Sequence, residues 1–108
     1  MSKLTPKFRL RDTVCVASSA GMWSVIGIYW HSDFQSFYYL IDNPSPEDGL
    51  SIKELADFST FNVYGFRLDV DGHTKFSIFR EDKILMFSRT DESIFTAEQI
   101  IKKEIYGD

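Results

Sequence analysis

Residues 21–42, GMWSVIGIYWHSDFQSFYYLID, carry seven aromatic side chains in twenty-two positions. Apolar residues recur there with a period of two, as in β-strands, and they fall on both faces of each strand. A strand that is apolar on both faces lies in a covered sheet or a curled barrel, or it shows one face to a partner. The stretch therefore predicts strands at 23–30 and 35–42, and it raises the question of what covers their second face.

Shorter alternations predict the remaining strands at 13–17, 62–70, 74–79 and 83–89. SSAG at 18–21 predicts a turn. Asp71-Gly72 predicts a type I′ hairpin turn between the strands at 62–70 and 74–79, because Gly tolerates positive φ. The connections are too short for parallel crossovers. We therefore expect a mostly antiparallel sheet of five or six strands that is curled or closed into a barrel.

Two helix starts are marked by capping boxes, in which a Ser or Thr and a Glu or Gln three residues later bond each other's backbone amides. The boxes and their predicted helices are Ser51 with Glu54, for about 52–58, and Thr96 with Gln99, for about 97–106. The fold class is therefore predicted as α+β in a single domain over 1–108. Each half of the chain is predicted to contain three strands, a loop and a capped helix. This pattern is explained either by an internal duplication or by the common succession of antiparallel strands and a helix.

Two short helices can cover at most one face of the sheet, so we expect aliphatic side chains to form the core and part of the aromatic set to stay exposed. The predicted core residues are Val14, Val16, Ile26, Ile28, Leu40, Ile78, Leu85 and Phe87. Hydrophobic residues make up 44% of the chain, which is enough for a core without disulfides or metals. The lone Cys15 fits a buried, inert thiol in a reducing compartment. No apolar run approaches the roughly 20 residues of a membrane span, and a cytoplasmic location is expected.

The net charge of −4 is unevenly distributed. Residues 1–11 carry four Lys and Arg and no acid, whereas 12–108 carry eight basic and 16 acidic residues. We expect 1–7 to be a flexible basic arm on an acidic body. The acid excess is explained either by a solvated surface or by a face that meets a basic partner, and it disfavours general binding to duplex nucleic acid.

Residues 8–41 resemble the opening of an SH3-like small barrel of the Tudor or KOW type, in which F-x-x-G-D-x-V introduces a first strand. Phe8, Asp12 and Val14 match this pattern, and Arg11 stands where the pattern has glycine. Such barrels are binding folds whose ligand usually lies on aromatic residues between loops. The resemblance implies that the aromatic candidates are Tyr29, Trp30, Phe34 and Tyr38.

Catalytic signatures are weak in this sequence. His31 and Asp33 form a conceivable proton-transfer pair, but a surface turn that contains a histidine is far more common. No serine lies in G-x-S-x-G, Asp69, Asp71 and Gly72 do not have calcium-loop spacing, and no phosphate loop is present. We therefore expect no enzyme, no metal and no cofactor.

Two binding hypotheses remain. The first is a small acidic protein-binding module, such as an inhibitor or immunity-type regulator, that docks a basic partner protein through exposed aromatic anchors with an acidic rim. The predicted rim residues are Asp33, Asp42, Glu47 and Asp48. The alternative is an SH3-like module that stacks the bases of single-stranded nucleic acid. The acidic body favours the first.

Overall fold

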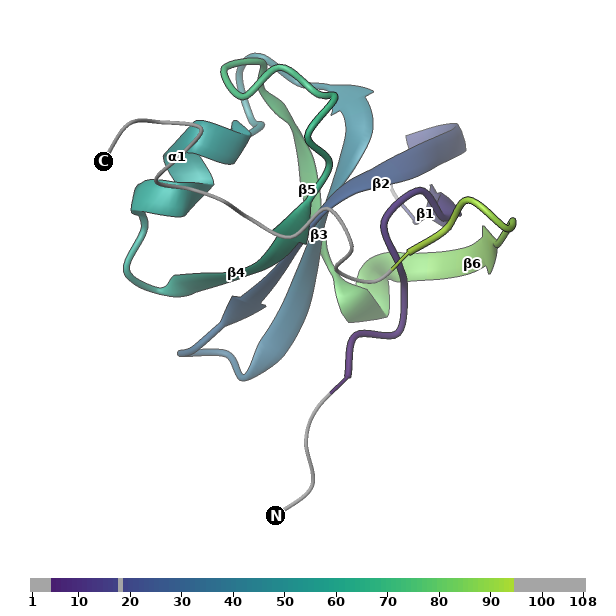
Figure 1. The fold of residues 1–108 in the computed structure, drawn as a ribbon, viewed down its shortest axis with the longest axis horizontal. Helices are drawn as coiled ribbons and strands as arrows, with labels where there is room; N and C mark the ends of the chain where they lie inside the picture. The colour runs from purple at the N-terminus through teal and green to yellow at the C-terminus, as the bar shows by residue number, and fades with distance from the viewer. Residues whose placement is uncertain (1–4, 18, 95–108) are drawn as a thin grey trace.

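The structure is a computed structural model that describes residues 5–17 and 19–94, and within them the strands dominate (Figure 1). The elements are β1 (Thr13–Val16), β2 (Ser19–His31), β3 (Ser36–Pro44), α1 (Ile52–Asp57), β4 (Phe61–Phe66), β5 (Phe76–Arg80), the 3₁₀ turn η1 (Glu81–Lys83) and β6 (Ile84–Ser88). Every strand pair is antiparallel, which confirms the predicted sheet type. The predicted helix at 97–106 lies outside the described residues, so the fold described is a sheet with one short helix.

The sheet is bent at β2, its longest strand. The strand order is β5-β3-β2-β1-β6, and β4 also pairs with β2. The first part of β2 pairs with β1 and its last part with β4, and its pairing with β3 shifts register between Val25 and Gly27. A Cβ on Gly27 would lie 2.7 Å from the Tyr29 ring, so glycine lets that ring lie against the strand. The bulge turns β1 and β6 away from β3, β4 and β5, as Figure 1 shows.

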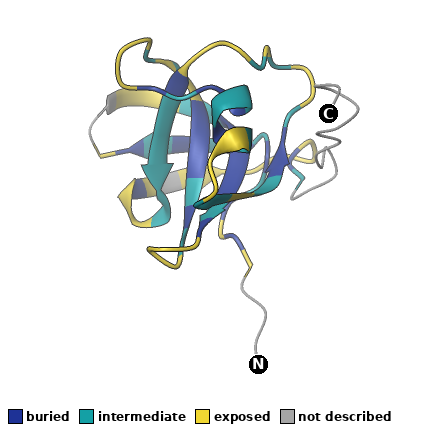
Figure 2. Ribbon diagram, turned by 90° about the vertical axis from the view of Figure 1, so that its left-hand side faces the viewer, coloured by how far each residue is buried: buried dark blue, intermediate teal, exposed yellow. Residues whose placement is uncertain are grey.

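Helix α1 begins at the predicted capping box. The Ser51 hydroxyl accepts a hydrogen bond from the Glu54 amide at 3.0 Å, and the Ser51 amide donates to the Glu54 carboxylate at 3.0 Å. The helix ends at Asp57, one residue before the predicted end. Its buried residues, Ile52 and Leu55, face the sheet, and Figure 2 shows the helix lying over the strands.

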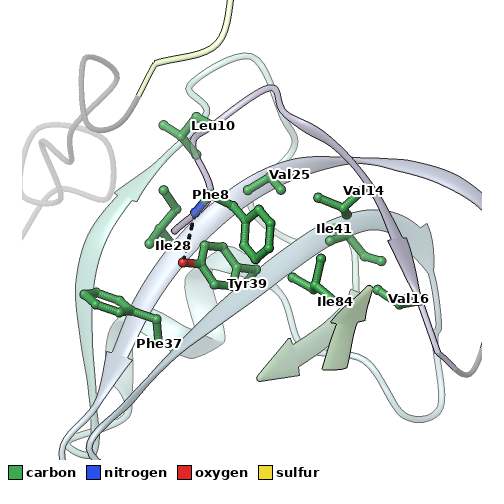
Figure 3. Packing of buried hydrophobic residues seen from close by; sticks show 10 residues of the cluster. All are labelled: Phe8, Leu10, Val14, Val16, Val25, Ile28, Phe37, Tyr39, Ile41 and Ile84. Carbon is green, nitrogen blue, oxygen red and sulfur yellow. Dashed lines mark hydrogen bonds between the residues drawn. The ribbon is translucent and has the colours of Figure 1, made fainter. Parts of the chain in front are cut away.

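One side of the sheet holds a cluster that we call the first core (Figure 3). Its residues are Phe8, Leu10, Val14, Val16, Val25, Ile28, Phe37, Tyr39, Ile41 and Ile84. The Phe8 ring packs edge-on against Tyr39 at 5.2 Å, and the Phe8 amide donates to the Tyr39 hydroxyl at 3.3 Å. The segment before β1 thus covers this face together with β1 and β6.

The other side of the sheet holds the second core, which α1 covers. Its residues are Ile26, Tyr29, Leu40, Ile52, Leu55, Phe66 and Phe76. Because β2 and β3 contribute to both cores, both of their faces are buried. The second face of the aromatic-rich strands is therefore covered mainly by other parts of this chain.

A tight turn leads into β1. Arg11 has φ +73°, in the left-handed region that favours glycine, and the Asp12 amide donates to the Arg9 carbonyl at 3.1 Å. The Asp12 carboxylate is fully buried and accepts from the Arg9 amide at 2.8 Å and from Arg89 Nη2 at 2.9 Å. This carboxylate raises the pKa of Arg89. The ion pair ties the turn to the chain that follows β6.

The core prediction was wrong at Leu85 and Phe87. Leu85 is 64% exposed and Phe87 is 40% exposed, whereas Ile84 is buried. Val14 lies opposite Phe87 and Val16 lies opposite Ile84, and the register of β1 with β6 shifts between Cys15 and Val16. Residues directly opposite each other share a face of the sheet, so this irregularity places Ile84 and Phe87 on the same side. Phe87 contacts Phe8 there at 5.1 Å but stays partly exposed. Of the other predicted core residues, Ile78 is half-buried and the rest are buried.

The predicted Asp71-Gly72 hairpin is also wrong. β4 ends at Phe66 and pairs with β2, whereas β5 pairs with β3, so these consecutive strands are not neighbours. The Asp71 carboxylate instead accepts from the His73 amide at 3.1 Å and from the Thr74 hydroxyl at 2.9 Å. The Gly72 carbonyl accepts from the Lys53 amide at 3.0 Å. This connection is fixed to α1. The turn predicted at 18–21 is shorter than expected, because β2 already begins at Ser19.

Candidate binding surface at the β2–β3 turn

The β2–β3 turn is a tight loop that projects one aromatic side chain. Gln35 has φ +51°, and its side-chain amide donates to the Ser32 carbonyl at 2.8 Å. The Phe34 amide donates to His31 Nδ1 at 3.2 Å. The Ser32 amide donates to the Thr60 carbonyl at 2.9 Å, which ties the turn to the segment before β4. These bonds hold the backbone of Phe34 while its side chain stays 61% exposed.

Aromatic rings from three parts of the chain meet behind this turn. We call His31, Phe34, Tyr38, Phe58 and Phe61 the turn cluster. The His31 ring is only 9% exposed; it stacks on Phe34 with centroids 4.6 Å apart and contacts Phe61 edge-on at 4.7 Å. Tyr38 contacts Phe61 at 5.4 Å, and Phe58, also exposed, lies 6.0 Å from Phe61. The cluster is a braced aromatic surface with two exposed members.

The predicted aromatic candidates have different positions. Tyr29 is fully buried in the second core, so it does not belong to an exposed aromatic face. Trp30 is half-buried on the opposite side of the sheet, where it packs edge-on against Phe37 at 4.8 Å. Phe34 and Tyr38 come together in the turn cluster, so two of the four candidates share one surface.

The predicted acidic rim is divided between two ends of the sheet. Asp33 is exposed in the β2–β3 turn, next to Phe34. Asp42 lies six residues beyond Ser36 on β3, about 20 Å away at the usual strand rise. Glu47 and Asp48 are exposed in the loop that follows β3. Only Asp33 of the four predicted acids therefore lies at the turn cluster.

A hollow of about 430 Å³ opens on the side of Phe34. It is lined by Lys7, Phe34, Gln35, Ser36, Arg80, Glu81 and Asp82. Arg80 forms a bidentate pair with Asp82 at 2.8 and 2.9 Å, which raises the pKa of Arg80 and lowers that of Asp82. Glu81 accepts from the Tyr39 hydroxyl at 2.6 Å and from the Lys7 amide at 2.9 Å. The hollow is polar, and its two cations are matched by two carboxylates.

The structure offers little for catalysis or metal binding at this end. His31 Nδ1 accepts from a backbone amide, so that nitrogen is not oriented by Asp33 as a catalytic pair would require. Among the described residues, no three His, Cys, Asp or Glu side chains gather as a metal site.

Sequence reasoning missed Phe58 and Phe61 because they lie outside the aromatic-rich stretch. The only signal was their place immediately after α1, where the chain must return to the sheet. A second exposed apolar pair, Leu85 and Phe87, lies on β6, with the Arg89 guanidinium 4.8 Å from the Phe87 ring. This pair is distant in sequence from the turn cluster and supplies a natural control for it.

Over residues 5–17 and 19–94, none of the helical segments has the length and apolar character of a membrane span. Comparison of the chain with family models, with curated proteins and with solved structures found no match.

Proposed function

We propose that the chain is a small, acidic, non-catalytic module that binds a basic partner protein through the turn cluster, in the manner of an inhibitor or immunity-type regulator. The observation that carries the proposal is Phe34, whose ring is 61% exposed although its backbone is held by the turn and its ring by His31. Aromatic anchors that are already ordered lose little conformational entropy on binding and dominate interface energies.

The charges near the turn cluster support a basic partner. Asp33 is exposed beside Phe34, and Asp57 is exposed beside Phe58. Acids at the rim raise the association rate with a cationic surface and make it depend on salt, whereas the buried anchors supply the affinity. The other three predicted acids, Asp42, Glu47 and Asp48, lie at the far end of β3. They add to the negative charge of the protein but do not border the turn cluster.

The test compares three tagged proteins: wild type, Phe34→Ala and Leu85→Ala. Leu85 is 64% exposed and lies on β6, so its removal matches the loss of exposed apolar surface. Each is incubated with extract of the source cells, with and without nuclease treatment, and the captured proteins are quantified by mass spectrometry. A partner enriched by wild type is then purified and its affinity measured.

Phe34→Ala should weaken this affinity by about 2 kcal/mol, roughly 30-fold, whereas Leu85→Ala should have little effect. Equal affinity of Phe34→Ala and wild type would contradict the proposal. So would capture that disappears entirely after nuclease treatment.

Binding of single-stranded nucleic acid is the second candidate, in an SH3-like barrel. Two observations support it: Lys7 and Arg80 line the hollow beside Phe34, and Arg11 has positive φ where the SH3-like opening has glycine. A base stacked on Phe34 would bring a phosphate within reach of these cations. Arg80 is already paired with Asp82, however, and the body is acidic, so we rank this candidate second.

Titration with single-stranded DNA and RNA separates the candidates. Asp33→Asn removes one negative charge at the turn, which should tighten binding to a polyanion and slow association with a basic protein at low salt. Micromolar nucleic-acid binding that tightens in Asp33→Asn would support the second candidate over the first.

A further inference from the structure

His31 holds the β2–β3 turn through one particular ring nitrogen. Nδ1 accepts the hydrogen bond of the Phe34 amide at 3.2 Å, so Nδ1 carries no proton in this conformation. A neutral ring then has its proton on Nε2, an assignment that follows from the hydrogen bond. The ring is 9% exposed and lies between Phe34 and Phe61. The position of the turn thus depends on the protonation state of one side chain.

Addition of a proton to Nδ1 would replace the acceptor with a donor. The Phe34 amide would then face an N–H group, and the bond that holds Phe34 over the imidazole would be lost. The stacked ring could still contact the imidazolium, because aromatic faces attract cations. The backbone of the turn, rather than the histidine ring, is therefore the part that must move.

The charged and titratable groups near His31 are few. Asp33 lies in the same turn and is exposed, Tyr38 on β3 contacts the ring at 5.6 Å, and Arg80 on β5 pairs in register with Tyr38. Asp57 is exposed at the end of α1, whereas β4 contributes the apolar Phe61. No ion pair joins His31 to a carboxylate within residues 5–17 and 19–94.

We propose that His31 is a proton-operated latch. Its neutral form fixes Phe34 on the turn cluster, and its protonated form releases the β2–β3 turn. Histidine is the side chain whose charge ordinarily changes between about pH 5 and 8, so this is the range in which the latch is tested. The inference concerns the chain alone and holds whether or not the turn cluster binds a partner.

The experiment follows the isolated protein by NMR between pH 8 and pH 5. The chemical shifts of the His31 ring protons report its protonation, and hydrogen exchange of the Phe34 amide, corrected for the intrinsic pH dependence, reports the latch. As the ring becomes protonated, protection of the Phe34 amide should fall about 2- to 10-fold, the effect of losing one hydrogen bond. The two titration midpoints should coincide.

Three variants sharpen the test. His31→Asn keeps an acceptor oxygen that does not titrate, so Phe34 protection should become independent of pH; His31→Phe keeps an aromatic ring without an acceptor, so protection should be low at every pH. His73→Gln removes the other histidine, which is exposed between β4 and β5, and should behave like wild type. A flat Phe34 response while the wild-type His31 ring titrates would overturn the proposal, and so would a ring that stays neutral until the protein unfolds.

Discussion

The two cores lie on opposite faces of the same strands, yet they are closed in different ways. The second core is closed by α1, which directly follows β3 and precedes β4, so its cover lies near in sequence to the strands beneath it. The first core is closed by residues far apart in the chain: Phe8 contacts Tyr39 and Phe87, and Asp12 pairs with Arg89. One face thus has a local cover, and the other is closed by the joining of distant segments.

The difference shows that a cover formed by nearby residues can be predicted from the local sequence, whereas a cover formed by distant segments cannot. α1 is visible from its capping box alone, because the signal and the structure occupy the same few residues. By contrast, no local pattern within residues 5–10 predicts that they pack against β3. The following predictions test whether the two covers also differ in energy.

The largest effect is expected at Phe8, which is 1% exposed and the central contact of the distant cover. Phe8→Ala should lower the free energy of unfolding by roughly 3 to 5 kcal/mol, because it leaves a cavity against Tyr39. Chemical denaturation measures the loss. Phe34→Ala, which removes an exposed ring of the same type, should cost far less; equal losses in the two variants would show that the segment before β1 does not contribute to the core.

Leu55 tests the local cover. It is fully buried on the sheet-facing side of α1, and Leu55→Ala should cost roughly 2 to 5 kcal/mol in the same assay. Its structural effect should be confined to α1 and the second core. Loss of NMR chemical-shift dispersion in the first core as well would mean that the two faces are not separable.

Tyr39 links the distant cover to the turn before β6, and its pKa offers a pH test. Burial and the hydrogen bond to Glu81 raise the pKa of Tyr39 well above its ordinary value of 10.0. The neutral hydroxyl is therefore favoured in the folded state, and its contribution to stability is complete below pH 10 and lost as pH rises above 10. In wild type, this residue should make stability fall by about 1.4 kcal/mol per pH unit there.

Tyr39→Phe should remove that dependence and cost about 1 to 3 kcal/mol at neutral pH, because the Phe8 amide and the Glu81 carboxylate lose a partner. Denaturation curves at pH 7, 10 and 11 measure both effects. An unchanged slope above pH 10 in Tyr39→Phe would assign the pH dependence to other tyrosines.

The smallest effect is expected at the start of the local cover. Ser51→Ala removes the N-cap and should cost about 1 kcal/mol, because the Glu54 amide loses its acceptor. Ser51→Asp keeps an acceptor at the cap and should retain most of the stability. A loss in Ser51→Ala that matches the loss in Leu55→Ala would indicate that the cap also supports the second core directly.

Strand positions and most core residues could be predicted, but the core residues of β6 could not. Period two assumes an unbroken alternation of faces, but the pairing of β1 with β6 shifts register near Ile84, and both Leu85 and Phe87 stay exposed. The Asp71-Gly72 dipeptide was compatible with a hairpin, but β4 and β5 pair with different strands. Local turn chemistry alone does not choose pairing partners.

The candidate site could be predicted in part. Phe34 and Tyr38 were found because the aromatic-rich stretch contains them, and Phe34 is exposed in the turn that joins its two strands. Tyr29 was misplaced because its burial depends on α1, which lies beyond the strand that contains it. Phe58 and Phe61 join the cluster only through tertiary pairing, which a single sequence does not display.

The Asp12–Arg89 pair has a consequence for synthesis on the ribosome. Its two side chains are 77 residues apart in the chain, so the first core cannot close until nearly all of the described sequence has been translated. Until then the emerging chain carries Phe8 and the apolar face of β3 uncovered, whereas α1 and the β2–β3 turn can form earlier. Contacts of such long separation also slow folding. The nascent protein is therefore most exposed to aggregation and to chaperones in the interval before Arg89 leaves the exit tunnel.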